Sequence, residues 1–213
     1  MRIVSEVMEM KMERNEYQKK IETLTYTVRE LMPKLPYHNF RHAIDVYSAV
    51  NTLAKLGRVS YENRFLLGTA ALLHDIIFVP GKKNNEEKSA EFARQYLPGI
   101  GYPIEQVEQV ERLILATKMP QNPNSYLEKI ICDADLDNLG RSDFFEYGAK
   151  LKIELNVLDN EKWNQQQLQF LKNHQYHTEV ARKLRNLGKA ANIRKLEKLL
   201  QECQDAGRRM VSN

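Results

Sequence analysis

Apolar residues recur at every third or fourth position along most of the chain, and long alternations of β-branched residues do not occur. This spacing is typical of helices that bury one face, so the pattern predicts an all-α fold. Proline and glycine divide the pattern into segments. The helices that we expect are 14–32, 37–56, 61–77, 86–97, 104–117, 126–135, 143–158, 162–186 and 189–204.

Local signals mark several of the expected helix ends. Pro33 and Pro36 stop the first helix, because proline cannot continue a helical hydrogen-bond ladder. Gly57 is expected to end the second helix and Ser60 to cap the third. Asn85 is a candidate N-cap for the fourth helix. Gly188 is expected to separate the last two helices.

One apolar run, from Ala70 to Phe78, is interrupted by the adjacent pair His74 and Asp75. An ionisable pair at the end of a core helix is costly unless another group compensates it. A divalent cation is a simple compensation, because it binds a neutral imidazole and a carboxylate together. The run therefore predicts a metal site.

Further candidate ligands occur elsewhere in the chain. His38 and His42 are four residues apart, so both would lie on one face of a helix. Asp133, Asp135 and Asp137 supply carboxylates at the end of another predicted helix. Mixed imidazole and carboxylate ligands favour Mn, Fe, Co, Ni or Zn over Ca, and Mg could accompany them. Remaining coordination positions would belong to water, as in a metal-dependent hydrolase.

These segments, taken in order, resemble the HD superfamily of metal-dependent phosphohydrolases. Residues 37–46 are similar to the signature at the start of the cyclic-nucleotide phosphodiesterase catalytic domain, which belongs to the same superfamily. The likeness covers about residues 35–154, and it is nearest to a bacterial group of predicted HD phosphohydrolases. The other matching segments are Leu73-His74-Asp75, Asn85 to Ala90, Ala116-Thr117-Lys118, Asp133 to Leu136 and Tyr147 to Glu154.

The resemblance implies an all-helical HD or phosphodiesterase-like bundle that binds one or two metal ions. It implies that one ion is held by His42, His74, Asp75 and Asp135. Asp75 would also bridge to a second ion, and His38 would protonate the leaving oxygen, because histidine titrates near neutral pH. Arg41 and Lys118 are candidates to hold phosphate oxygens. The expected catalytic residues are His38, Asp75, Arg41 and Lys118.

The expected activity is hydrolysis of a phosphomonoester or phosphodiester, with a nucleotide as the small phosphorylated substrate and a metal-activated water as the attacking group. Two departures from the family pattern leave an alternative open. Phe78-Val79 stand where the phosphodiesterases have a further histidine, and Met119-Pro120 follow Lys118 where the bacterial group tends to have one. The alternative is a degenerate HD domain that binds a nucleotide, a phosphate or a partner without turnover.

Composition narrows the class of protein. With 213 residues, the chain is expected to form a single HD-type domain over 1–213, with its core at about 35–155 and C-terminal helices at about 160–206. Two cysteines, no secretory signal and no membrane-length apolar run favour a cytoplasmic protein without a membrane partner. A net charge of +4 is too small to predict nucleic-acid binding.

The C-terminal region carries two further features. Basic residues outnumber acidic ones over 179–205, so an interaction module for nucleic acid or protein is a third, weaker hypothesis. His174 and His177 are expected in a polar helix, either solvated or at the rim of a substrate site. The sequence leaves a homo-oligomer open.

Overall fold

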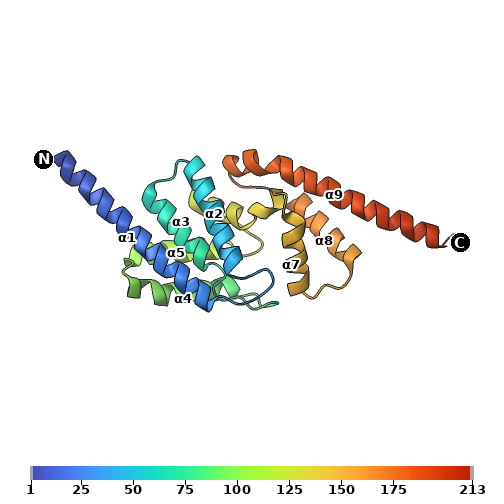
Figure 1. The fold of residues 1–213 in the computed structure, drawn as a ribbon, viewed down its shortest axis with the longest axis horizontal. Coiled ribbons are helices and arrows are strands. Elements are labelled where there is room, and N and C mark those ends of the chain that lie inside the picture. The colour runs from blue at the N-terminus through green and yellow to red at the C-terminus, as the bar shows by residue number, and fades with distance from the viewer. Residues whose placement is uncertain (1, 212–213) are drawn as a thin grey trace.

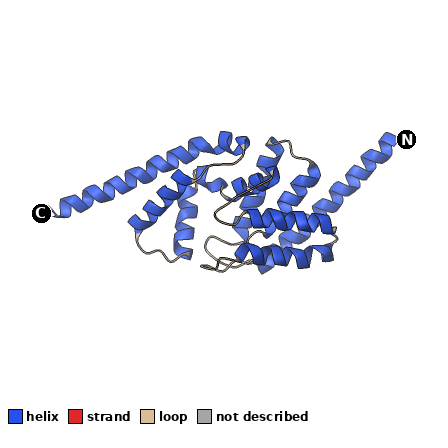
Figure 2. Ribbon diagram, turned by 180° about the vertical axis from the view of Figure 1, so that it is seen from behind, coloured by secondary structure: helices blue, strands red, loops and turns tan. Residues whose placement is uncertain are grey.

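The computed structural model describes the backbone of residues 2–211 and the side chains of residues 11–205. Within this range the regular structure is helical and contains no strand, which confirms the all-α prediction (Figure 2). The elements are α1 (Arg2–Leu31), α2 (Phe40–Leu56), α3 (Tyr61–Leu73), α4 (Asn85–Tyr96), η1 (Leu97–Ile100), α5 (Ile104–Ala116), α6 (Tyr126–Asp135), η2 (Asp137–Gly140), α7 (Phe144–Glu154), α8 (Asn160–Asn173) and α9 (Glu179–Val211).

Helices α1 and α9 are much longer than the others and extend beyond the bundle at opposite ends (Figure 1). Between them, α2 packs on α3 and α6, and α4 packs on α5. Helices α7 and α8 lie toward the C-terminal end, where α9 contacts both α8 and η2. The predicted core of about 35–155 therefore includes α7, and α8 and α9 lie on its C-terminal side (Figure 1).

Helix α3 forms the centre of the hydrophobic core. Every residue from Phe65 to Leu73 is buried, because the apolar run leaves the helix no polar face over these positions. Tyr17 of α1 stacks on Phe65, with ring centroids 4.0 Å apart. Helix α3 packs on α1, α2, α5 and α6, and the His74-Asp75 pair follows directly from its end.

Several expected helix ends are confirmed. The N–H of Gly57 bonds to the carbonyl of Leu53 and closes α2. The Ser60 hydroxyl accepts from the N–H of Asn63 at the start of α3. No helix among the residues that the structure describes is both long enough and apolar enough to cross a membrane.

Two expectations around the histidines are wrong. Helix α2 begins at Phe40, with Asn39 as its N-cap, so His38 precedes the helix and does not share a helical face with His42. Helix α3 ends at Leu73 instead of continuing to residue 77, and His74 and Asp75 lie in the turn that follows. Both changes place polar side chains at helix ends, where backbone groups are also free to bond.

The expected helix ends at Asn85 and Gly188 are also wrong. Asn85 lies inside α4, and its side chain bonds to the backbone N–H and carbonyl of Val79. Gly188 lies inside α9, and the break falls instead at residues 174–178, so His174 and His177 are in a loop. A Cβ atom on Gly188 would collide with the carbonyl oxygen of Gly140, so glycine here permits close packing of α9 on η2.

Candidate metal centre

His42 enters the site from the first turn of α2. The side chain of Asn39 caps this turn by accepting from the N–H of Arg41 at 2.9 Å and the N–H of His42 at 3.4 Å. The cap satisfies amide groups that a helix start leaves unpaired. It also fixes the point from which the buried His42 ring projects into the bundle.

His74 and Asp75 reach the same point from the end of α3. The Nδ1 atom of His74 lies 2.9 Å from the carbonyl oxygen of Ala71, so Nδ1 carries the proton that this bond needs. The Nε2 atom is then left to face the other side chains, as in many metal-binding histidines. It lies 3.0 Å from Oδ2 of Asp75. His74 and Asp75 are both buried.

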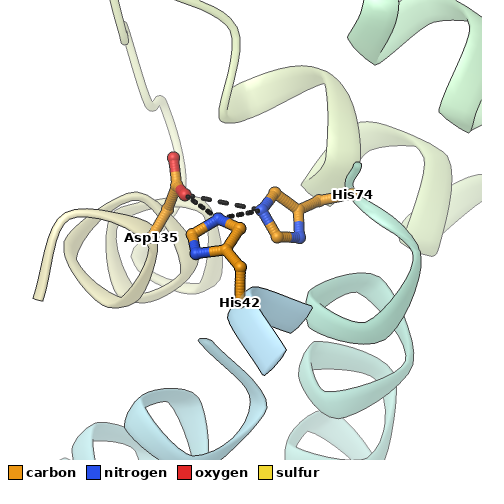
Figure 3. A group of neighbouring side chains, drawn as sticks. All are labelled: His42, His74 and Asp135. Carbon is orange, nitrogen blue, oxygen red and sulfur yellow. Dashed lines mark hydrogen bonds and ion pairs between the residues drawn. The ribbon is translucent and has the colours of Figure 1, made fainter. Parts of the chain in front are cut away.

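Asp135, the last residue of α6, completes the group. Figure 3 shows the carboxylate of Asp135 and the rings of His42 and His74 pointing toward one another from three different helices. The two Nε2 atoms are 3.3 Å apart, and they lie 3.5 and 3.4 Å from Oδ1 of Asp135. Oδ2 of Asp75 lies 3.4 Å from Nε2 of His42. The structure therefore brings together all four ligands that the resemblance implies.

These separations fit a shared cation. Two ligand atoms that are each about 2.1 Å from one ion lie roughly 3.0 to 3.4 Å apart at octahedral or tetrahedral angles. The five separations that involve a histidine nitrogen run from 3.0 to 3.5 Å. Among the described residues, the group whose ligand atoms all lie within 4.8 Å of one another is His42, His74 and Asp135, and Asp75 approaches it through the two histidines. The donor set of two imidazoles and two carboxylates suits transition metals.

The electrostatics of the group follow from two acids and two bases buried together. Burial lowers the pKa of both histidines, but the carboxylates outweigh it and raise the pKa of His42 and, more strongly, that of His74. Burial raises the pKa of Asp135, but hydrogen bonds from His42 and His74 bring this pKa to about 2. In the same way the charge of His74 holds the pKa of Asp75 well below its usual range. Positive charge is thus favoured between the two carboxylates. A bound metal cation would supply that charge in place of protons on the histidines.

His38 lies beside the group, with Nε2 3.9 Å from Oδ2 of Asp75. Its ring stacks on Phe78 with centroids 3.5 Å apart, and its Nδ1 bonds to the carboxylate of Glu154. Glu154 also accepts from the N–H groups of Tyr37 and His38 at 2.9 and 3.0 Å. Burial raises the pKa of Glu154, but the bond from His38 outweighs it, so this pKa is lowered and Glu154 stays charged.

The two predicted phosphate-binding cations lie apart from this group. Lys118 forms an ion pair with Glu87 outside the cavity beside the site. Arg41 is exposed and lines a second groove, which His42 also borders. It does not line the cavity that contains His74, Asp75 and Asp135. Their role in holding phosphate stays a prediction.

The segment that carries Asp135 is anchored by its neighbours. Asp133 accepts from the N–H of His177, from the N–H of Thr178 and from the hydroxyl of Thr178, at 2.7 to 2.8 Å. Asp137 accepts from Nε and Nη2 of Arg185 at 2.6 and 2.9 Å. Asp133 and Asp137 therefore fasten the end of α6 to the start of α9, while Asp135 between them points into the site.

Sequence reasoning missed several residues around the centre. It did not assign a role to Glu154, although this residue lay in a segment that matched the family. It gave no signal for Asn138 and Trp163, which line a cavity of about 480 Å³ beside the metal ligands. His74, Asp75 and Asp135 line this cavity too, so the candidate centre opens into a space large enough for a ligand.

Comparison with known proteins agrees with this architecture. The family model of the HD domain matches residues 39–137. Among solved structures, the fold is similar to that of YpgQ from Bacillus subtilis, which was crystallised in complex with ADP, with a TM-score of 0.65 and 21% sequence identity. That alignment covers 86% of this chain and 96% of the YpgQ chain. No curated protein matches the sequence.

The family match spans the segments that supply the candidate ligands. His42, His74, Asp75 and Asp135 all fall within residues 39–137, whereas α7, α8 and α9 lie beyond them. Residues 39–137 of this chain therefore match the HD domain family.

Proposed function

We propose that this protein is a metal-dependent phosphohydrolase that cleaves a phosphomonoester or phosphodiester of a nucleotide. The observation that carries the proposal is the convergence of two imidazoles on two carboxylates beside a cavity: the Nε2 atoms of His42 and His74 are 3.3 Å apart, and each lies 3.0 to 3.5 Å from both carboxylates. YpgQ, which shares the fold, was crystallised with ADP, and this supports a nucleotide as the ligand class.

His42, His74, Asp75 and Asp135 would hold a divalent transition metal, and whether a second ion binds stays open. When bound, such an ion lowers the pKa of water and stabilises charge on phosphate oxygens. In the reaction one water is consumed, one P–O bond forms at phosphorus and the ester P–O bond breaks. The products are a phosphate or a phosphomonoester and the alcohol.

His38 is suited to protonate the leaving oxygen. Its Nδ1 bonds to Glu154, which leaves Nε2 directed at the cavity side of the group, 3.9 Å from Asp75. The bond to Glu154 fixes the orientation of the ring, so Nε2 is the ring nitrogen from which a proton could pass to the leaving oxygen. Stacking on Phe78 holds the ring in place.

The test is product release from nucleoside monophosphates and from bis(4-nitrophenyl) phosphate in the presence of Mn²⁺. We expect wild-type activity that EDTA removes and that Asp75→Asn lowers by at least about 10²-fold, while the control Glu91→Gln keeps it. Glu91 is an exposed carboxylate that pairs with Lys88. Equal turnover by Asp75→Asn and wild type would show that this mechanism is wrong.

A degenerate domain that binds a nucleotide without turnover is the second candidate. It is favoured by the absence of a histidine at Phe78-Val79 and by the positions of Arg41 and Lys118 away from the cavity lining. A nucleotide that binds but survives long incubation with Mn²⁺ would favour this second candidate.

A further inference from the structure

The cavity beside the candidate metal centre has two unlike sides. One side is formed by His38, His74, Asp75 and Asp135, which belong to the site itself. The facing side is formed by residues of α7 and α8, including Phe144, Leu151, Trp163 and Phe170. Helices α7 and α8 lie outside residues 39–137, so this wall is not part of the segment that the HD-domain model matches.

The α7–α8 wall is mainly aromatic and aliphatic. Phe144 and Trp163 expose only 2% and 7% of their surface, and Phe170 packs against the hydrophobic core. Aromatic faces of this kind bind flat ring systems through stacking and burial of apolar surface. The reacting phosphate would lie at the metal centre, so the wall faces the remaining organic part of the substrate.

One polar group in the cavity lacks a partner. Asn138 is 8% exposed and lines the cavity, and its Oδ1 atom is buried with no hydrogen bond among the described residues. A buried amide oxygen without a donor is unfavourable, so a ligand N–H or O–H at this position would be stabilising. Gln166 and Gln167 add two more amides to the same lining.

The charges around the cavity limit how many phosphate groups a bound substrate can carry. Among the described residues that line it there is no lysine or arginine, whereas Glu86, Asp75 and Asp135 are acidic. One divalent cation would offset two of these carboxylates. A chain of several phosphates, with three or four negative charges, would then find no cation of the protein within the cavity.

We propose that the cavity selects a substrate with a single phosphate and an uncharged, flat ring group of the nucleoside type, held against the α7–α8 wall with a donor directed at Asn138. This inference rests on the proposed function and narrows its substrate class. The inference therefore predicts that this chain does not prefer a polyphosphate such as ADP, the nucleotide with which YpgQ was crystallised.

Trp163 is the only tryptophan of the chain, so its emission reports on the cavity. The probes are adenosine, guanosine, cytidine and thymidine. The monophosphate and the triphosphate of each nucleoside are titrated in parallel series, with EDTA present throughout. We expect a saturable change with at least one nucleoside, and binding of its triphosphate that is at least about tenfold weaker than that of its monophosphate. No saturable change with any nucleoside, or a triphosphate that binds as tightly, would overturn the inference.

Two variants and a control locate the binding. We expect Asn138→Leu and Gln167→Ala each to weaken nucleoside binding by about fivefold or more, since each removes an amide from the lining. Gln165→Ala is the control, because Gln165 is exposed on the same helix and bonds to Glu161 outside the cavity. If Asn138→Leu does not fold, Gln167→Ala still tests whether the nucleoside binds in this cavity. Equal affinity of Gln167→Ala and Gln165→Ala would contradict the assignment.

These titrations need neither metal nor turnover, so they can fail separately from the proposed function. Nucleoside binding in EDTA without any hydrolysis in Mn²⁺ would leave nucleoside recognition by the cavity standing and remove the phosphohydrolase. Metal-dependent hydrolysis that prefers triphosphates would leave the phosphohydrolase standing and remove the inference.

Discussion

The ion pair between Arg185 and Asp137 offers the sharpest test of how the C-terminal helix supports the candidate centre. Two bonds of 2.6 and 2.9 Å join the guanidinium to the carboxylate. The Asp137 side chain is only 3% exposed, while that of Arg185 is 26% exposed. Replacement Arg185→Met keeps the apolar length of the side chain and removes the charge.

The expected cost follows from the carboxylate that is left behind. Without Arg185, the remaining cation near Asp137 is Arg141, whose Nη1 is 3.5 Å away and also serves Asp45. Breaking one partner from a buried pair costs about 3 to 5 kcal/mol, and partial exposure of Arg185 brings the expected loss to about 2 to 4 kcal/mol. Since Asp137 lies two residues from Asp135, we also expect Mn²⁺ affinity to fall by about tenfold or more.

The assay is the free energy of unfolding from denaturant titration, together with Mn²⁺ binding by calorimetry. Lys183→Met is the matched control on α9, because Lys183 pairs with Glu179 and both side chains are more than two-thirds exposed, at 75% and 71%. The control should change stability by less than about 0.5 kcal/mol. In the double variant Arg185→Met with Asp137→Leu, no charge is left unpaired, and most of the stability should return.

The reasoning would be refuted if Arg185→Met lost no more stability than Lys183→Met. It would also be refuted if the double variant were less stable than Arg185→Met alone, because the unpaired carboxylate would then not be the source of the loss.

Three further predictions concern other parts of the molecule. Glu154→Gln should lower kcat about tenfold or more with little change in KM, because His38 loses its charged partner; an unchanged kcat in steady-state assays would contradict this. Burial lowers the pKa of His174 to about 4, so stability should fall by up to about 3 kcal/mol between pH 6.5 and pH 4, where the unfolded chain binds a proton that the folded chain does not. His174→Gln should flatten that fall in denaturant titrations at stepped pH, and an equally steep fall would be inconsistent. Gly188→Ala, normally favourable in a helix, should cost about 1 to 3 kcal/mol because its Cβ meets Gly140; a raised Tm would count against this.

Sequence reasoning predicted the helical class from local patterns, and the resemblance singled out four side chains that the structure brings together; their role as metal ligands stays a prediction. The apolar run that leads to His74 predicted a buried helix whose polar end needs a partner such as a cation. The resemblance supplied the other candidate ligands. The helix break before α9 was missed for a physical reason. It depends on Asp133, which accepts hydrogen bonds from Thr178 across 45 residues of chain, and no local pattern reveals such a contact.

The residues proposed to bind the nucleoside were likewise beyond the sequence pattern. In the sequence, Asn138 has the character of an ordinary turn residue. Its buried amide oxygen, which accepts no hydrogen bond from the described residues, is evident only in the folded structure, where η2 borders the cavity. Trp163 reads as one apolar position of a polar helix, and its place in the cavity depends on how α8 packs. Residues that act through tertiary placement need the structure to be found.

The central claim is that His42, His74, Asp75 and Asp135 hold a metal ion, and the metal content of the purified, tag-free protein tests it most directly. Elemental mass spectrometry should find at least about one transition-metal ion per chain, lost in His74→Ala and kept in the control His177→Ala. A wild-type protein that carries no ion, and takes up none from Mn, Fe, Co, Ni or Zn solutions, would contradict the account.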